Sequence, residues 1–280
     1  MNKHLSDVLL RECEQHRSGG IYEATQIQFA WNSNHMEGST LTPEQAAQLF
    51  HHPQLETLPG AHVSRDDVLE MRNHFAAFRY VLRTVDQTVD KTYVCTLHRM
   101  LKECTSQARD PRYNVGGYKL HPNMISRGLT PVIVAAPKAV PGLMEEFISR
   151  CQALTDNPLS IASMHWLFER IHPFSDGNGR VGRLVLFKEL LRINALPMII
   201  HDGLHDRYTM ALSKFVREPG YLVDLLLYER DLYLAQLLEP AGMGLDSARV
   251  SYRYHDSWQE SELPEIISAN TALAARIEKR

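Results

Sequence analysis

The twelve residues from His172 to Arg183 limit what this chain can fold into more than any other segment. Before them, Leu159 to Ile171 repeats apolar residues at helical spacing, and Asn157 and Pro158 suit the cap and first position of a helix. After them, Val181 to Ala195 is rich in Leu, Val and Phe, which predicts a second, largely buried helix. The segment is therefore predicted to form a loop between two helices.

The loop itself has the composition of an anion-binding turn. Because Pro173 disfavours helical angles at the residue before it, we expect His172 in an extended conformation where the first helix ends. Gly177 and Gly179 can adopt positive φ angles, which Asn178 tolerates better than most residues. Such a turn directs successive N–H groups toward one anion, at a helix start whose dipole also favours negative charge. The loop is therefore predicted to bind phosphate.

Three charged side chains and the histidine complete this prediction. Arg180 and Arg183 are three residues apart on the predicted helix, so both guanidinium groups can reach the same anion. Asp176 adds an oxygen ligand beside the phosphates, and Mg²⁺ is commonly held by one or two carboxylates together with phosphate oxygens. His172 is the one group here that can accept a proton near neutral pH. The residues together predict a nucleotide phosphate site with a general base at its edge.

Other interpretations of these patterns are weaker. Residues 177–182 also satisfy the dinucleotide-binding pattern Gly-x-Gly-x-x-Gly, but that pattern requires a preceding strand, whereas a helical pattern precedes it here. A simple hairpin turn would need alternating strands on both sides, which are absent from the sequence pattern. His201-Asp202 and His205-Asp206 are compatible with a metal-dependent phosphohydrolase, yet the sequence places no further ligands with them. The phosphate site remains the preferred interpretation.

Residues 172–183 resemble the signature of the Fic family, His-x-Phe-x-Asp/Glu-Gly-Asn-Gly-Arg-x-x-Arg, with every fixed position filled. The resemblance implies an all-α Fic fold with a small β-hairpin flap, and transfer of AMP from ATP to a Ser, Thr or Tyr hydroxyl of a target protein. It implies ATP as co-substrate, Mg²⁺ on Asp176 and His172 as the catalytic base, with Phe174 pointing into the core. The nucleotide-binding residues that it implies are Gly177, Asn178, Gly179, Arg180 and Arg183. Removal of AMP by the same site, and a module that binds ATP without catalysis, remain open alternatives.

Residues 1–60 are predicted to form a separate N-terminal helical region. One helix is expected from Tyr22 to Glu37, closed by Gly38, with Ile27, Ala30, Trp31 and Met36 as candidate buried positions. Thr42, Pro43 and Gln45 predict the start of the next helix through a capping box.

Within that region, Ser33 to Gly38 resembles the inhibitory motif of many Fic proteins, Ser/Thr-x-x-x-Glu-Gly/Asn. The resemblance implies that Glu37 pairs with Arg183, so that this arginine cannot hold the γ-phosphate of ATP and the protein inhibits itself. A carboxylate in the last turn of a helix meets the negative end of the dipole, which also favours a cationic partner for Glu37. The plain alternative is an exposed charge that water screens.

Residues 61–238 are predicted to form the catalytic core, and the least helical part of it is residues 113–140. Asn123–Ser126 and Val132–Ala135 are β-prone and predict a small hairpin, although an ordinary surface loop is the alternative. In the family this hairpin is the flap, which holds an extended target segment by strand addition. The residues that would dock the target are Ser126, Arg127 and Gly128. The Gly-x-Tyr-Lys run ending at Lys119 resembles the family's Gly-x-Tyr-Arg, but lysine lacks the guanidinium fork, so no role is assigned to it.

Residues 239–280 are predicted to be a C-terminal linker followed by a helix from about Pro264. A net charge of −3 argues against a nucleic-acid-binding face, and the sequence contains neither a signal peptide nor a membrane-length apolar run. Four widely spaced cysteines without a Cys-x-x-Cys pair are expected to be buried, reduced thiols of a cytoplasmic protein. The expected partners are an unidentified target protein, the chain itself through self-modification, and a second copy in a homo-oligomer.

Overall fold

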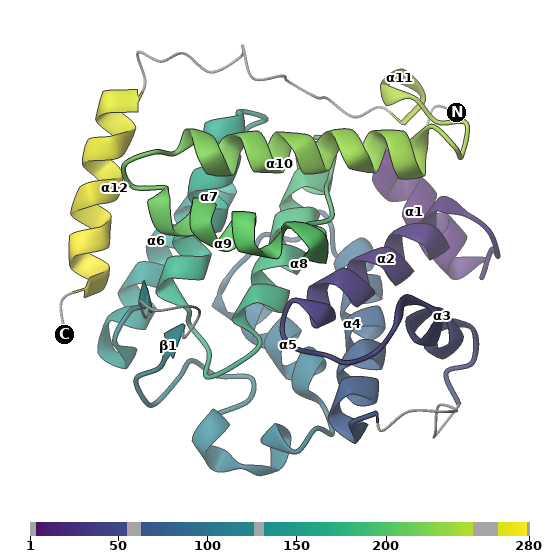
Figure 1. The fold of residues 1–280 in the computed structure, drawn as a ribbon, viewed down its shortest axis with the longest axis horizontal. Helices are drawn as coiled ribbons and strands as arrows, with labels where there is room; N and C mark the ends of the chain where they lie inside the picture. The colour runs from purple at the N-terminus through teal and green to yellow at the C-terminus, as the bar shows by residue number, and fades with distance from the viewer. Residues whose placement is uncertain (1–3, 55–62, 126–131, 249–262, 279–280) are drawn as a thin grey trace.

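The structure is a computed structural model that describes residues 4–54, 63–125, 132–248 and 263–278. Helices make up most of it and surround α8 (Asn178–Arg192), as Figure 1 shows, and every residue of α8 except Arg192 is buried. Short 3₁₀ turns span Gln107–Arg109, Pro111–Tyr113, Pro137–Ala139 and Asp202–Leu204, and a π-helical turn, Leu234–Leu238, extends α10. The other helices are α1 (Leu5–Glu14), α2 (Ile21–His35), α3 (Pro43–His51), α4 (Arg65–Arg83), α5 (Lys91–Lys102), α6 (Val140–Gln152), α7 (Pro158–Ile171), α9 (His205–Lys214), α10 (Gly220–Tyr233), α11 (Leu245–Ala248) and α12 (Leu263–Glu278).

The described residues contain one small sheet, the hairpin of β1 (Met124–Ile125) and β2 (Val132–Ile133). The strands are antiparallel, with Met124 opposite Ile133 and Ile125 opposite Val132. The prediction of an all-α fold with a small β-hairpin is therefore confirmed. The three residues predicted to dock the target, Ser126, Arg127 and Gly128, lie outside the described residues.

Local capping signals place the helix starts as predicted. The Thr42 side chain accepts the Gln45 N–H at 3.2 Å, while the Gln45 side chain accepts the Thr42 N–H at 3.0 Å, which is the expected capping box. The Asn157 side chain accepts the N–H groups of Leu159 and Ser160 at 2.9 and 3.0 Å. Each such cap stabilises its helix by about 1 kcal/mol.

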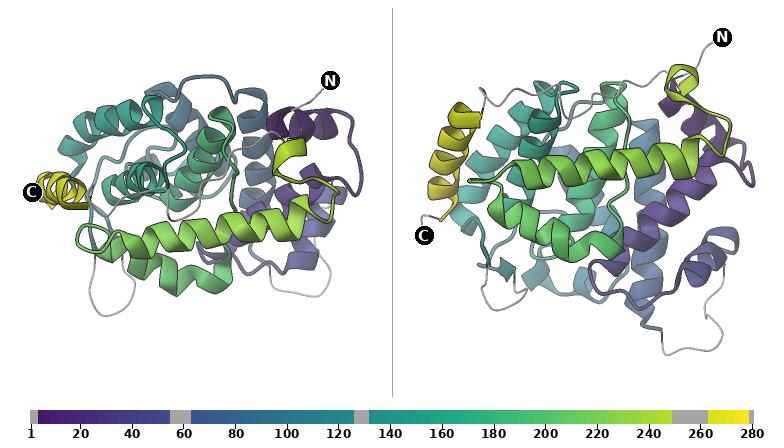
Figure 2. Two further views of the ribbon diagram at one scale, coloured as in Figure 1. Left: turned by 90° about the horizontal axis from the view of Figure 1, so that it is seen from above. Right: turned by 45° about the horizontal axis from the view of Figure 1, so that its top comes forward.

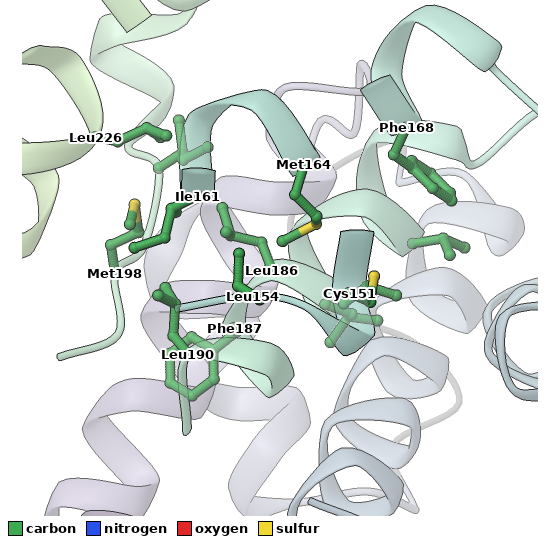
Figure 3. Close-up of a cluster of buried hydrophobic side chains, with 14 of the residues drawn as sticks. Cys151, Leu154, Ile161, Met164, Phe168, Leu186, Phe187, Leu190, Met198 and Leu226 are labelled. Carbon is green, nitrogen blue, oxygen red and sulfur yellow. The ribbon is translucent and has the colours of Figure 1, made fainter. Parts of the chain in front are cut away.

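The core is built on the contact between α7 and α8. Figure 3 shows Ile161, Met164 and Phe168 of α7 beside side chains of α8, with Cys151, Leu154, Met198 and Leu226 around them. At the other side of α8, Phe187 stacks on Phe29 of α2 at 5.2 Å and meets Phe78 of α4 edge-on at 5.2 Å. Burying an aromatic side chain in this way stabilises the fold by about 1.5–3 kcal/mol. This packing holds α2 against the helix that follows the signature loop.

Two expectations about burial were wrong. Ile27 and Trp31 of α2 are only partly buried, because Phe29 and Ala30 occupy the face toward α8 and α4. The four cysteines are free, as expected, but Cys104 is exposed and Cys95 half-buried, whereas the other two are buried.

The ends of the described chain belong to the same core. Buried residues of α1 and of α12 are both part of one continuous hydrophobic cluster with α7 and α8. In Figure 2, α10 crosses one face of the molecule, and α12 lies at an edge next to α6 and α7, where Arg276 pairs with Glu146 at 2.8 Å. The predicted domain boundaries at residues 60 and 238 stay a prediction. In the described part of the chain, no helix is both long and apolar enough to cross a membrane.

Candidate active site

The first helix ends at Ile171, as predicted, but the conformation of His172 is not the extended one expected. Its φ and ψ are 52° and 61°, the left-handed region, and its N–H donates to the Phe168 carbonyl at 3.0 Å. Many helices end on such a residue because its N–H satisfies one of the free carbonyls of the last turn. For a residue other than glycine this conformation costs on the order of 1 kcal/mol, so neighbouring contacts have to hold it.

The second helix begins three residues earlier than predicted, at Asn178. Gly177 has the expected positive φ, at 74°, but Asn178 and Gly179 are helical and not part of the loop. The Asn178 side chain accepts the Phe174 N–H at 2.7 Å and donates to the Phe174 carbonyl at 2.9 Å. Asn178 therefore braces the loop through its side chain instead of bending it through its backbone.

Gly179 is needed for space and not for its φ angle. A Cβ atom at this position would overlap the Glu37 carboxylate and would lie 2.8 Å from Nη1 of Arg183. A side chain here would therefore displace the Glu37 carboxylate from Arg183.

Phe174 anchors the loop, as expected from the family resemblance. Its side chain is fully buried and stacks on His98 of α5 with the ring centroids 4.0 Å apart. His98 in turn accepts the Gly116 N–H at 3.1 Å through Nδ1. Burial, followed by the nearby Lys102 cation, lowers the pKa of His98 to about 3, so this imidazole is neutral.

His172 is also neutral at physiological pH. Burial, followed by the positive charge of Lys119, lowers its pKa to about 4, although Glu37 and Asp176 act in the opposite direction. The residue is partly exposed and its Nδ1 is buried. A neutral imidazole of this kind can accept a proton without first losing one.

Arg183 and Glu37 form the ion pair that the inhibitory motif implies. Arg183 Nη2 lies 2.8 Å from Glu37 Oε1, and the guanidinium also donates to Oγ and to the carbonyl of Ser33, both at 2.9 Å. The Arg183 side chain is 3% exposed and that of Glu37 21% exposed. Burial alone would lower the pKa of Arg183, but the interactions with Glu37, Tyr208 and Glu169 together outweigh it and the pKa is raised. Glu37 itself lies two residues beyond the end of α2, not in its last turn.

The two arginines do not converge on one anion in this structure. Arg180 pairs with Glu70 of α4 and donates through Nη1 to Asn34 Oδ1 at 3.3 Å, while its Nη2 lies 3.7 Å from Asp176 Oδ2. Each guanidinium is thus neutralised by its own carboxylate, one from α4 and one from the end of α2.

Lys102 is a further charged residue of the site, which sequence reasoning missed. Its ammonium group is fully buried, 2.5 Å from Glu70 Oε1 and paired with Asp176. Burial by itself would raise the pKa of Asp176, but Lys102 and Arg180 outweigh it and the pKa is lowered. Lys102 directly follows the apolar stripe of α5, so its position carried no signal. Glu70 lies on α4 and pairs with both Lys102 and Arg180.

Asp176 has one property expected of a magnesium ligand, a partly exposed carboxylate. Its side chain is 35% exposed beside Gly177, and one carboxylate can hold Mg²⁺ when phosphate oxygens and water supply the other ligands. Its Oδ2, however, is engaged by Lys102. Across residues 4–54, 63–125, 132–248 and 263–278, no group of three or more His, Cys, Asp or Glu side chains is placed to hold a metal ion by itself. His201, from the phosphohydrolase alternative, bonds Glu229 through Nδ1 at 2.6 Å.

Sequence comparisons with known proteins find similarity to Fic proteins. Residues 88–190 match the model of the Fic/DOC family. The protein adenylyltransferase Fic of Aedes aegypti is 34% identical over 99 residues, which are 32% of this chain and 19% of that protein. The protein of the same name from Drosophila melanogaster is 27% identical over 223 residues, 74% of this chain and 42% of that protein. The chain thus spans less than half the length of these curated relatives.

Solved structures agree on the fold. A Fic domain containing signaling protein from Bacteroides thetaiotaomicron superposes with a TM-score of 0.64 at 23% identity, over 83% of this chain and 91% of that one. Fic-1 from C. elegans gives a TM-score of 0.61 at 17% identity, over 85% of this chain and 73% of that one. The signature loop, the helices that frame it and the matched segment lead to one conclusion: residues 88–190 of this chain are similar to the Fic/DOC family model, on a fold shared with the solved Fic structures.

Proposed function

We propose that this chain is a protein adenylyltransferase, which moves AMP from ATP to a Ser, Thr or Tyr hydroxyl of a target protein. The observation that carries the proposal is a neutral imidazole, His172, next to a helix start that holds Gly177 and two buried arginines. The curated relatives named protein adenylyltransferase support it.

The nucleotide would lie at the first turn of α8. The N–H groups that follow Gly177 are free of intrahelical partners at a helix start and can donate to phosphate oxygens. Arg180 and Arg183 would neutralise the negative charge of the departing pyrophosphate once they leave their present carboxylates. Asp176 would hold Mg²⁺, which supplies further charge neutralisation to the phosphates when bound.

His172 would act as the general base. Because its Nδ1 is buried, Nε2 is the nitrogen left to take the proton of the target hydroxyl. The hydroxyl oxygen then attacks the α-phosphorus, the bond from that phosphorus to the β-phosphate oxygen breaks, and pyrophosphate leaves. Proton removal by a positioned base contributes about 10²–10⁴ in rate. Positioning and charge neutralisation would supply most of the remaining acceleration.

We further propose that the Glu37–Arg183 pair is inhibitory. While Arg183 is held by Glu37 and Ser33, it cannot contact the γ-phosphate, so ATP would bind with its α-phosphate misaligned for attack. Three hydrogen bonds from the buried Arg183 guanidinium would stabilise this state.

Removal of AMP from a modified protein is the second candidate function. The Glu37 carboxylate is partly exposed and lies near enough to influence the charge of His172. It could therefore align a water molecule for attack on an AMP–protein bond. Incubation of an AMP-modified chain with parent protein and with Glu37→Gln separates the two: hydrolysis that depends on Glu37 supports removal.

His172→Ala tests the proposed function. We expect loss of label transfer from α-phosphate-labelled ATP to protein, with nucleotide binding retained and the transferred group identified as AMP by mass spectrometry. Equal behaviour of parent and variant in every assay would instead favour a module that only binds ATP. The chain itself is the first acceptor to test, because the target protein is unidentified. A cytoplasmic location and a homo-oligomer remain parts of the proposal; four free cysteines are in keeping with a reducing compartment.

A further inference from the structure

Lys119 is a buried lysine that touches the signature loop from outside it. Its side chain is 2% exposed, and its Nζ donates to Asn123 Oδ1 at 2.7 Å and to the Ile171 carbonyl at 3.4 Å. Its backbone N–H donates to the Pro173 carbonyl at 2.8 Å. Lys119 therefore donates hydrogen bonds to the backbone carbonyls on both sides of His172.

Asn123 continues the same set of contacts toward the hairpin. Its amide nitrogen donates to the Phe174 carbonyl at 2.9 Å and contacts the Ser175 carbonyl at 3.5 Å. The next residue, Met124, begins β1. The first strand of the hairpin is thus attached directly to the loop that carries His172.

These contacts stabilise an unfavourable backbone conformation at His172. His172 has a left-handed conformation that is unfavourable for a residue with a side chain, and such conformations persist only where the surroundings impose them. Carbonyl groups before and after His172 are both held by Lys119, and the next carbonyl along the loop is held by Asn123.

We propose that Lys119 and Asn123 form a clamp that holds the target-docking strand and the general base in a fixed relation, with Lys119 as a positioning residue for His172. Docking of a target segment on β1 would then act on the loop of the base through Asn123. The inference rests on the proposed function, since only a reaction with a protein hydroxyl requires that the strand and the imidazole be aligned.

The Lys119 charge has a second effect, on the protonation of His172. The groups that influence this imidazole are Lys119, the Glu37 and Asp176 carboxylates and the Glu169 backbone. Burial lowers the pKa of Lys119 to about 8, so the amine is still charged at the pH where His172 titrates. Without this cation, the pKa of His172 should rise, because a neighbouring positive charge no longer opposes protonation.

The test compares Lys119→Met, Lys119→Arg and Asn123→Ala in the full chain. Lys91→Met is the matched control, because the Lys91 amine lies 5.4 Å from the ring of Tyr118, the direct neighbour of Lys119. Histidine-labelled protein is titrated by NMR from about pH 8 to about pH 5, the range around the ordinary histidine pKa. The His172 signal is assigned by its loss in His172→Ala. Amide exchange is measured at Met124 and Ile125.

In the parent, the His172 signal should stay that of a neutral imidazole throughout. In Lys119→Met the pKa should rise by about one unit, so that protonation begins at the acid end of the range. Lys119→Arg and the Lys91 control should behave like the parent. Asn123→Ala should leave the titration unchanged but speed exchange at Met124 and Ile125 by on the order of tenfold, because one charge-neutral hydrogen bond contributes about 1 kcal/mol.

An unmoved His172 titration in folded Lys119→Met, or unchanged exchange in Asn123→Ala, overturns the clamp. If Lys119→Met does not fold, the Asn123→Ala exchange result decides alone. Neither the His172 titration nor the amide exchange uses ATP or a target protein, so the clamp and the proposed function are tested independently. Absence of AMP transfer in parent and His172→Ala alike removes the proposed function, whereas a parental value in either clamp measurement removes only this inference.

Discussion

If the Glu37–Arg183 pair is inhibitory as proposed, replacing Glu37 by glycine should release the activity. The pair is a charge-assisted hydrogen bond of 2.8 Å, and such bonds contribute about 1.5–3 kcal/mol. Because the Glu37 side chain is only 21% exposed, solvent weakens the pair less than it would at the surface. If binding of the γ-phosphate must first break this bond, its removal should raise the rate about 10- to 100-fold.

The assay is self-labelling from α-phosphate-labelled ATP, with urea unfolding to show that each protein is folded. Glu37→Gln keeps the size of the side chain and removes its charge, so it should lie between the parent and Glu37→Gly. Glu23→Gly is the control, because Glu23 lies on α2, the helix that precedes Glu37, but pairs with His51 at 3.5 Å instead of with Arg183. Equal labelling by folded parent and Glu37→Gly would refute the inhibitory role of the pair.

Four further outcomes follow from the geometry. Gly179→Ala should lower the free energy of unfolding of the parent by about 1–3 kcal/mol, because the new Cβ overlaps the Glu37 carboxylate. The same substitution in Glu37→Gly should lower it by less. Equal losses in urea unfolding would contradict this. The acid limb of the transfer rate should lie below about pH 5, because the pKa of His172 is about 4 and the base is neutral above it; a limb near pH 6.5, the ordinary histidine value, would count against it. Asp176 has a lowered pKa in the folded state, so its contribution to stability is present above its unfolded pKa of about 3.9 and is lost as pH falls below that; Asp176→Asn should remove this part of the acid unfolding profile. A thiol reagent should modify exposed Cys104 rapidly in native protein and the two buried cysteines only on unfolding, which peptide mapping can check.

Much of the local structure was predictable from the sequence. The helix before the signature, its Asn157 cap, the capping box at Thr42 and a small hairpin were all expected, and the structure has them, the hairpin as Met124–Ile125 paired with Val132–Ile133. Caps and amphipathic helices depend on residues a few positions apart, so their patterns are visible in a linear sequence. The family resemblance added the pairing of Glu37 with Arg183, which no local pattern could have predicted alone.

The tertiary structure decided how the site is held and charged. Sequence gave no reason to expect Lys102 beneath the loop or Lys119 beside the base, because each acts on residues more than fifty positions away. It also suggested the wrong reason for Gly179, whose small size matters only because the end of α2 packs against α8. The sequence by itself determined which helices form and which residues can carry the chemistry, since those depend on near neighbours. Only folding, which brings buried charges from distant helices together, decided that Glu70 and Asp176 are neutralised by Lys102 and Arg180, and that His172 stays neutral.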